Sequence, residues 1–212
     1  GVSLCLYGPP GTGKTEFARY LAFRAGRPIV YRRASDLISK WVGESEKLIA
    51  AAFRAAETEG AVLVFDEVDT FLRDREKAHA GWEVTQVNEC LQQLEAFKGM
   101  VGCTTNLLHG MDPAAMRRFV FKVEFSYAGA SQAGVLFDSL LAGFLAHPLT
   151  ETDRAQLARE FGRMPSLAAG DFAAVARRTR ALGGLATMGE LLAALAEEVA
   201  VKRAPRAASG FV

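Results

Sequence analysis

The stretch Gly8-Pro9-Pro10-Gly11-Thr12-Gly13-Lys14-Thr15 decides the fold of this chain. It has the pattern G-x-x-x-x-G-K-[ST] of a P-loop, or Walker A motif, which encloses phosphate groups. Glycines let the backbone turn successive N–H groups toward one anion, and a following helix adds its unsatisfied N–H groups and positive dipole end. An apolar run at Val2–Tyr7 precedes the motif and a helical pattern at Thr15–Ala25 follows it, so the strand–loop–helix context of a phosphate site is present.

Two acidic residues follow another apolar run. Ala61–Phe65 has the composition of a buried strand, and Asp66 and Glu67 come directly after it. Ligands bind at the carboxyl ends of strands in open α/β sheets. We therefore interpret Asp66 as holding Mg²⁺ through water and Glu67 as the general base for an attacking water. A solvated acidic loop is the alternative, which the P-loop upstream disfavours. Within the P-loop motif, Lys14 can reach the β- and γ-phosphates, and Thr15 can place its hydroxyl on Mg²⁺.

The first part of the chain predicts an α/β domain with a mostly parallel sheet, because short β-rich runs alternate with helical patterns. The predicted strands are Val2–Tyr7, Pro28–Arg32, Ala61–Phe65, Met100–Thr104 and Val120–Phe125. The predicted helices of this part are Thr15–Ala25, Glu44–Thr58 and Glu83–Phe97.

After about Ser126 the strand signals end, and alanine and leucine dominate. The predicted helices here are Ser131–Ala146, Thr150–Phe161, Ala169–Ala181 and Thr187–Lys202. Thr150 followed by Asp153 resembles a capping box. We therefore divide the chain into an α/β nucleotide-binding domain at residues 1–127, a helical domain at 128–203 and a tail or linker at 204–212. We expect the whole to be a fragment of a longer protein.

The composition excludes several classes of protein. A formal net charge of +1 gives no overall field that would attract nucleic acid. The three cysteines lack CxxC spacing, so they form neither a disulfide framework nor a zinc site. Cys5 and Cys103 lie in apolar runs and are predicted to be buried free thiols, which fits a cytoplasmic protein. The sequence has no apolar stretch of membrane-spanning length and no signal-peptide pattern.

Taken together, these motifs resemble the AAA+ ATPases and, within them, the AAA clade. That clade favours this wording of the P-loop, its acidic motif is similar to Val64-Phe65-Asp66-Glu67-Val68-Asp69, and the similarity covers nearly the whole chain. The resemblance implies a P-loop NTPase fold with a parallel five-stranded sheet in the order 5-1-4-3-2 and a C-terminal helical lid. It also implies that ATP and Mg²⁺ bind between the two parts and that ATP is hydrolysed.

Two further segments occur in the family's order. Thr104-Thr105-Asn106 is similar to the sensor-1 segment, which implies that Asn106 hydrogen-bonds the γ-phosphate or the attacking water; a turn-forming asparagine is the alternative. The segment at 112–119 resembles the arginine-finger segment, which implies that Arg117 and Arg118 act on the nucleotide of a neighbouring subunit. A solvated basic helix end is the alternative. The sequence does not say which arginine is the principal finger.

The segment at 39–47 resembles the family's first pore loop. The resemblance implies a substrate-binding loop made of Lys40, Trp41, Val42 and Gly43. In such a loop the aromatic ring grips a threaded polypeptide through a large contact that is indifferent to sequence. A tryptophan packed in the core is the alternative.

Two weaker likenesses complete the comparison with the family. Ala168-Ala169-Gly170-Asp171-Phe172 resembles a lid segment near the adenine and ribose, which implies a nucleotide-binding place for Gly170. An ordinary helix N-terminus capped near Asp171 is the alternative. The charged stretch Arg73–Gly81 would match a second pore loop, and a plain solvated loop is its alternative. The sequence lacks the usual segment upstream of the first strand that helps to hold the adenine.

The resemblance favours one function over two others. It implies a protein-remodelling ATPase that works as a hexameric ring on a polypeptide substrate. A DNA-directed loader is disfavoured by the near-neutral charge and by Trp41, since DNA tracking needs a basic stripe. A scaffold that binds ATP with little turnover is disfavoured by the intact Glu67.

Overall fold

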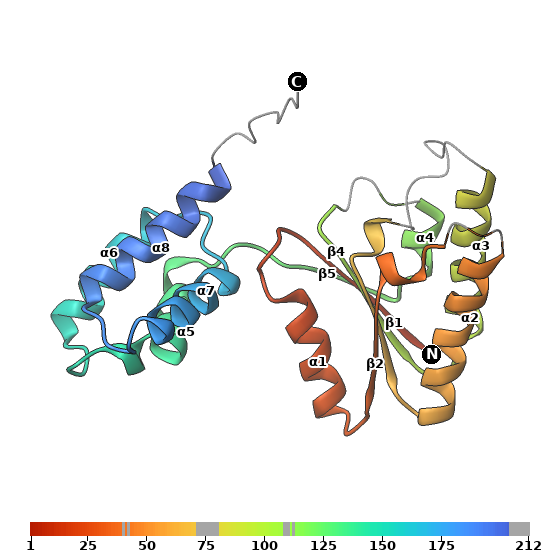
Figure 1. The fold of residues 1–212 in the computed structure, drawn as a ribbon, viewed down its shortest axis with the longest axis horizontal. Helices are drawn as coiled ribbons and strands as arrows, with labels where there is room; N and C mark the ends of the chain where they lie inside the picture. Colours follow the sequence, from red (N-terminus) through yellow and green to blue (C-terminus); the bar gives the residue numbers. More distant parts are fainter. Residues whose placement is uncertain (40, 42, 71–80, 108–110, 112, 204–212) are drawn as a thin grey trace. The chain divides into compact units, whose positions relative to one another are not determined.

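The computed structural model of the chain describes residues 1–39, 41, 43–70, 81–107, 111 and 113–203. The chain divides into two compact units, the first at Gly1–Phe125 and the second beginning at Ser126 (Figure 1). The first is built around a sheet and the second is built from helices, and each is described by itself. The predicted tail at 204–212 lies outside the described residues.

The first unit contains one five-stranded sheet in which every neighbouring pair is parallel. Its strands are β1 Val2–Tyr7, β2 Ile29–Arg33, β3 Val62–Asp66, β4 Met100–Thr105 and β5 Phe121–Glu124. Their order is β2-β3-β4-β1-β5. Read from the other edge, this is the predicted order 5-1-4-3-2, so the predicted fold class is confirmed.

Six helical segments lie between these strands in the described part of the unit. They are α1 Lys14–Arg24, the 3₁₀ turn η1 Ala34–Leu37, α2 Glu44–Glu59, the 3₁₀ turn η2 Val68–Thr70, α3 Gly81–Ala96 and α4 Pro113–Arg118. The short α4 was not predicted as a helix, because six residues are too few for an apolar period. Its first residue, Pro113, is typical of the first position of a helix.

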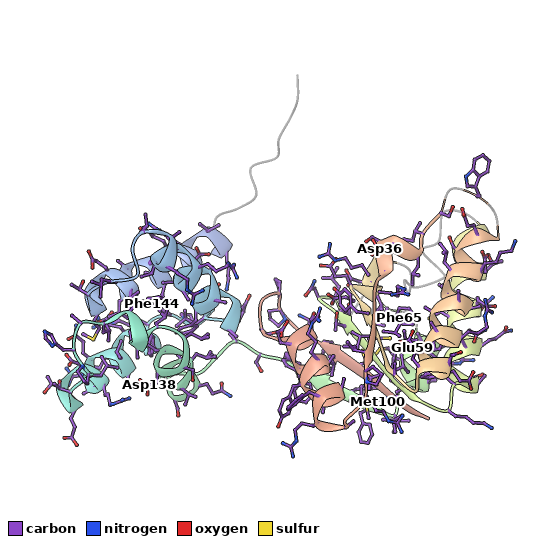
Figure 2. All side chains as sticks on the ribbon, turned by 60° about the horizontal axis from the view of Figure 1, so that its bottom comes forward. Asp36, Glu59, Phe65, Met100, Asp138 and Phe144 are labelled. Carbon is purple, nitrogen blue, oxygen red and sulfur yellow. The ribbon has the colours of Figure 1, made fainter. Side chains whose placement is uncertain are left out.

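The sheet is covered on both faces, with α1 on one side and α2 and α3 on the other (Figure 1). Side chains alternate across β3, as the two-residue period of a strand requires. Leu63 and Phe65 pack into the core beneath α2 and α3, whereas Val62 and Val64 pack beneath α1. Figure 2 shows Phe65 among the side chains between the sheet and the helices. All the hydrophobic residues of this strand are buried, which fixes the position of the acidic residues at its end.

The second unit consists of four α-helices and one 3₁₀ turn among the described residues. They are α5 Ala130–Leu140, η5 Ala142–Phe144, α6 Glu151–Gly162, α7 Ala169–Ala181 and α8 Met188–Arg203. Its core includes the fully buried side chains of Phe137, Phe172 and Leu191. The capping box at the start of α6 is confirmed, since Thr150 and Asp153 exchange hydrogen bonds between side chain and backbone.

The prediction of one helix over Ser131–Ala146 was wrong at its end. The α-helix stops at Leu140, and the chain turns through η5 before Leu145 forms a bridge with Ala186. The backbone N–H of Ala186 donates to the carbonyl of Phe144 at 3.0 Å. This tertiary pairing outweighs the helical tendency of the alanine- and leucine-rich sequence.

The three cysteines can be compared directly with the prediction from composition. Cys5, Cys90 and Cys103 are all buried and free, as predicted for the first and third. Burial raises the pKa of the Cys5 thiol to about 11 and that of the Cys90 thiol to about 12, so neither is ionised near neutral pH. None of the helices in the described part of the chain has the length and apolar composition needed to cross a bilayer.

Candidate functional site

The loop at 8–13 depends on glycine for its shape. Gly8, Gly11 and Gly13 have φ angles of 134°, 77° and 96°, in the region that L side chains rarely adopt. A Cβ on Gly8 would also lie 2.0 Å from the carbonyl oxygen of Phe125, so no side chain fits there. The Thr12 hydroxyl donates to the carbonyl of Pro9 at 2.8 Å and ties the loop to itself. The loop ends at Gly13, the N-cap of α1.

The ammonium group of Lys14 lies inside this loop. The residue is only 7% exposed, and its Nζ donates to the carbonyls of Gly8 and Pro9 and to Oδ1 of Asn106, each at 2.8 Å. All three acceptors are neutral. Hydrogen bonds between an ammonium and an anionic oxygen are stronger than those to neutral oxygens, so a phosphate is a better partner than any of the three.

Burial and nearby carboxylates act in opposite directions on this lysine. Burial lowers the pKa of Lys14, and the negative charges of Asp66, Asp69 and Glu67 offset part of that shift, leaving the pKa below its ordinary value. The lysine therefore has a desolvated positive charge with carboxylates close enough to act on it. This is the electrostatic setting that a polyanion bound with a cation would complete.

Asp66, the last residue of β3, receives three hydroxyl donors. The hydroxyls of Thr15 and Thr104 donate to its Oδ1, the former at 3.0 Å, and the Tyr31 hydroxyl donates to Oδ2 at 2.5 Å. Burial raises the pKa of the Asp66 carboxyl, but these three hydrogen bonds and the charge of Arg33 outweigh it, and the pKa lies below its usual value. The carboxylate is therefore ionised at neutral pH and suited to a hydrated cation.

Glu67 has a left-handed backbone, with φ 59°, although it is not glycine. This conformation costs about 1–2 kcal/mol for an L-residue. Its N–H donates to Oγ1 of Thr104 at 3.2 Å, while the same Oγ1 donates to Asp66. Thr104 thus fixes both acids from the neighbouring strand. The side chain of Glu67 is exposed, where a water could approach it.

The end of β4 provides the third part of the site. Asn106 follows that strand and accepts from Lys14, so the predicted sensor residue lies at the P-loop lysine. Thr105 donates to Oδ1 of Asp69 at 3.1 Å and accepts from the N–H of Leu107 at 3.1 Å. The predicted residues of three separate strands therefore meet at one edge of the sheet, as parallel topology requires.

Two residues of this site escaped sequence reasoning. Tyr31 and Thr104 both hydrogen-bond Asp66, but neither belongs to a motif that assigns such a role. The register of the sheet brings them there, since Phe65 pairs with Cys103 and Arg33 pairs with Asp66. Hydroxyl-bearing residues at or near the ends of the strands beside β3 were the only available signal.

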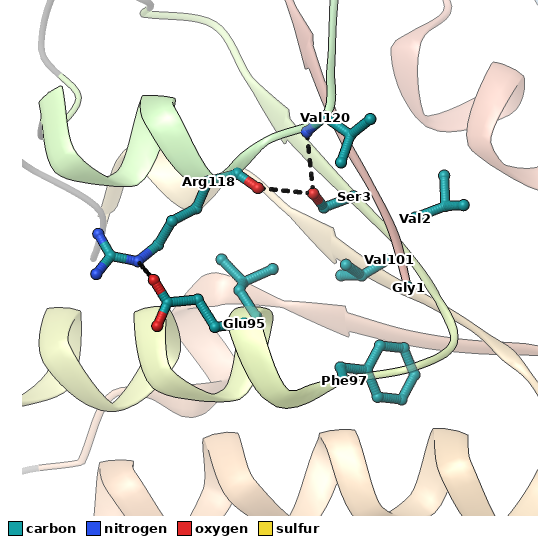
Figure 3. A pocket seen from close by; sticks show the side chains of 9 residues that line it. Gly1, Val2, Ser3, Glu95, Phe97, Val101, Arg118 and Val120 are labelled. Carbon is teal, nitrogen blue, oxygen red and sulfur yellow. Dashed lines mark hydrogen bonds and ion pairs between the residues drawn. The ribbon is translucent and has the colours of Figure 1, made fainter.

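The two candidate finger arginines differ in their surroundings. Arg117 is exposed at the end of α4. Arg118 instead forms an ion pair with Glu95, Nε to Oε1 at 2.5 Å, and donates to the carbonyl of Ala114 at 3.0 Å (Figure 3). Its own carbonyl accepts from the hydroxyl of Ser3, which also lines the small pocket beside this ion pair. The interactions described for these side chains do not include the P-loop or Asp66.

The pore-loop prediction falls partly outside the described residues. Lys40 and Val42 are not described, nor are residues 71–80 of the second predicted loop. Trp41 is 77% exposed, so its side chain is not part of the core. Gly43 has φ 81° and is the N-cap of α2.

Gly170 lies in the first turn of α7, in the second unit. Beside it, Asp171 is buried and accepts from the N–H of Ala168 at 2.8 Å. This is the capped helix N-terminus that was the alternative for this segment. A role of Gly170 toward nucleotide stays a prediction.

The comparison with known families agrees with this geometry. Residues 4–127 match the family described as "ATPase family associated with various cellular activities (AAA)". The chain belongs to the AAA family of ATPases. Membership of this family implies that the AAA domain binds nucleotide, and it explains why the P-loop, the acidic pair and Asn106 converge.

Individual relatives of this AAA chain are matched over most of its length. It is 34% identical over 163 residues to Spastin of Sus scrofa, covering 74% of this chain and 26% of that protein. It is also 34% identical over 155 residues to "Protein SUPPRESSOR OF K(+) TRANSPORT GROWTH DEFECT 1" of Arabidopsis thaliana, covering 70% of this chain and 35% of the relative. A "Mitochondrial sorting homolog" of Caenorhabditis elegans is 32% identical over 144 residues, 65% of this chain and 42% of that protein. The chain therefore spans less than half the length of these relatives.

Proposed function

We propose that this AAA domain binds ATP together with Mg²⁺ and hydrolyses it. The observation that carries the proposal is the pairing of Thr15 with Asp66 at 3.0 Å beside the buried ammonium of Lys14. A threonine hydroxyl that donates to a carboxylate keeps its lone pairs for a metal ion. Oxygen donors of this kind suit Mg²⁺, which is usually bound by one or two protein oxygens together with substrate phosphates. The residues present therefore fit a magnesium nucleotide.

Each side chain has a distinct task in this proposal. Lys14 exchanges its neutral acceptors for phosphate oxygens, and the N–H groups of the loop bind the same anion. Thr15 would hold Mg²⁺ directly, and Asp66 would hold it through a water molecule. The bound ion would neutralise charge that develops on the phosphates. Glu67 accepts a proton from the attacking water. Asn106 orients that water or the γ-phosphate.

Replacement of Glu67 tests the hydrolytic part of this proposal. Glu67→Gln keeps the size of the side chain but removes the base, so we expect ATP turnover to fall roughly 10²–10⁴-fold. Binding of ATP should persist, because Lys14 and the loop are intact. The rate of phosphate release measures ATP turnover, and retention of radiolabelled ATP measures binding. Turnover close to that of the unaltered protein would contradict the role of Glu67.

We further propose that the chain assembles into a ring, which the family resemblance implies to be a hexamer. In this ring Arg117 reaches the nucleotide of the adjacent subunit. Its exposure supports this role, whereas the ion pair of Arg118 with Glu95 occupies that guanidinium within its own subunit. A positive charge delivered in trans can accelerate phosphoryl transfer by about 10³–10⁵. Arg117→Ala should therefore reduce turnover more than Arg118→Ala does. The opposite ranking, with both proteins assembled to the same size, would contradict the assignment.

The proposed product of hydrolysis is remodelling of a polypeptide substrate. The exposed indole of Trp41 supports this part, because a large apolar side chain in water is suited to gripping chains of any sequence. We expect unfolded polypeptide to stimulate ATP turnover more than DNA does. Trp41→Ala should remove the stimulation by polypeptide and leave basal turnover intact. Stimulation by DNA alone would favour a loader acting on nucleic acid instead.

A further inference from the structure

Tyr31 lies beside the acidic pair although no motif includes it. It is the third residue of β2 and is partly buried. Its hydroxyl is 2.5 Å from Oδ2 of Asp66. A tyrosine hydroxyl carries its proton at neutral pH, so it is the donor and the carboxylate is the acceptor.

The tyrosine ring is fixed from a second direction. The guanidinium carbon of Arg19 lies 4.9 Å from the ring centroid, within the range of a cation–π contact. Arg19 belongs to α1, the helix that follows the P-loop. One side chain therefore connects the P-loop helix, the edge strand β2 and the carboxylate at the end of β3.

The three donors around Asp66 are distributed unequally. Thr15 and Thr104 both donate to Oδ1, and Tyr31 is the donor to Oδ2 among the described residues. The terminal torsion of an aspartate has a broad energy profile, so the orientation of its carboxylate plane is set by the hydrogen bonds that it accepts. Donors on both oxygens limit rotation about the Cβ–Cγ bond more than donors on one oxygen do, and Tyr31 provides the donor on Oδ2. Each carboxylate oxygen has about two acceptor sites, so Oδ2 keeps one beside the tyrosine.

We propose that Tyr31 is a positioning residue for the magnesium site: its hydroxyl holds the carboxylate plane of Asp66 so that the remaining acceptor site of Oδ2 faces a water bound to Mg²⁺. The inference rests on the proposed ATP- and Mg²⁺-binding function. Tyr31 would then contribute to Mg²⁺ affinity from β2, a strand that carries none of the family motifs.

The test is Tyr31→Phe, which removes the hydroxyl and keeps the ring over which Arg19 lies. The matched control is Tyr20→Phe, which removes a hydroxyl that accepts from Arg24 on the outer part of α1. For both variants we would measure the Mg²⁺ concentration that half-saturates ATP turnover. We would also measure the affinity for a fluorescent ATP analogue with Mg²⁺ and in EDTA, together with the thermal unfolding temperature.

We expect Tyr31→Phe to raise the half-saturating Mg²⁺ concentration about tenfold, equivalent to about 1.4 kcal/mol. Nucleotide affinity in EDTA and the unfolding temperature should match those of the Tyr20→Phe control. At saturating Mg²⁺, ATP turnover by Tyr31→Phe should come within about threefold of that of the unaltered protein, because the hydroxyl acts on metal binding and not on the reacting atoms. Arg19→Met, which keeps the hydroxyl and removes the cation above the ring, should shift the Mg²⁺ requirement in the same direction by about threefold.

Three results would overturn the inference. An unchanged or lower Mg²⁺ requirement in Tyr31→Phe would show that the hydroxyl does not prepare Asp66. A lower unfolding temperature with equal loss of affinity in Mg²⁺ and in EDTA would show a purely structural role. If the unaltered protein bound nucleotide with no dependence on Mg²⁺, both the proposed function and this inference would fail. The first two results would leave the proposed function standing.

Discussion

The two units of this chain each contain a lysine whose ammonium is held by oxygen acceptors, and the two are satisfied in different ways. In the first unit, Lys14 donates to two backbone carbonyls and an amide oxygen. In the second, Lys202 lies 2.5 Å from Oδ2 of Asp171, whose side chain is 6% exposed. The lysine of the helical unit has its counter-charge in direct contact, whereas the acceptors of the P-loop lysine are neutral.

This difference separates a site kept for a ligand from a contact that holds a fold together. A desolvated cation with neutral acceptors is unfavourable for the folded state, which is why the pKa of Lys14 falls below its ordinary value. The same unit also holds Glu67 in a left-handed conformation. Such costs cluster at functional sites. In the second unit, the capping box at Thr150 satisfies the start of α6, and Asp171 at the start of α7 is paired with Lys202 of α8.

The largest expected contrast comes from replacing each lysine with methionine, which keeps the apolar stem. Lys14→Met should weaken ATP binding at least about 100-fold, since it removes charge-assisted bonds of about 1.5–3 kcal/mol each. The folded state has a lowered Lys14 pKa, so its charge opposes folding at all pH values below that pKa. The free energy of unfolding should therefore stay level or rise at neutral pH. Equilibrium nucleotide binding and urea unfolding measure the two quantities.

Lys202→Met should show the reverse pattern, with lower stability and unchanged nucleotide binding. It leaves the buried carboxylate of Asp171 with the N–H of Ala168 as its other donor. Removing one partner of a buried pair costs about 3–5 kcal/mol, and because the Lys202 side chain is 26% exposed we expect about 2 kcal/mol here. Nucleotide affinity of the remaining folded protein should not change. If instead both variants lost stability equally and both kept nucleotide binding, the distinction between the two lysines would be wrong.

The smallest expected effect is at the start of α6. Thr150→Ala removes the hydroxyl that accepts from the N–H of Asp153 at 3.2 Å. Loss of an N-cap typically destabilises a helix by about 1 kcal/mol, so the melting temperature should fall by a few degrees. ATP turnover should be unaffected in the folded fraction. Thr150→Ser keeps the hydroxyl and is the control, and a fall of the same size in that variant would show that the cap is not the cause.

The parts of the site that sequence predicted share one physical property: each follows directly from local spacing. The glycines, Lys14 and Thr15 form one continuous segment, Asp66 ends one apolar strand and Asn106 follows another. Parallel topology then brings the strand ends to a common edge. The order of the five strands came from family resemblance, not from spacing.

The parts that sequence did not predict depend on register and on side-chain reach between strands. The Tyr31 hydroxyl reaches Asp66 only because β2 and β3 pair with Arg33 opposite Asp66. Similarly, the pairing of Arg118 with Glu95 joins α4 to α3, and no local pattern links those two residues. The early end of α5 has the same origin, since a bridge to Ala186 replaces the helix.

We infer that the ammonium of Lys14 is held in place for a nucleotide phosphate. A crystal structure of this protein with Mg²⁺ and a non-hydrolysable ATP analogue would show whether it is. We predict that Nζ of Lys14 leaves the carbonyls of Gly8 and Pro9 for the β- and γ-phosphate oxygens, with the Thr15 hydroxyl about 2.1 Å from Mg²⁺. Nucleotide bound elsewhere, with Lys14 still donating to the loop carbonyls, would contradict the claim.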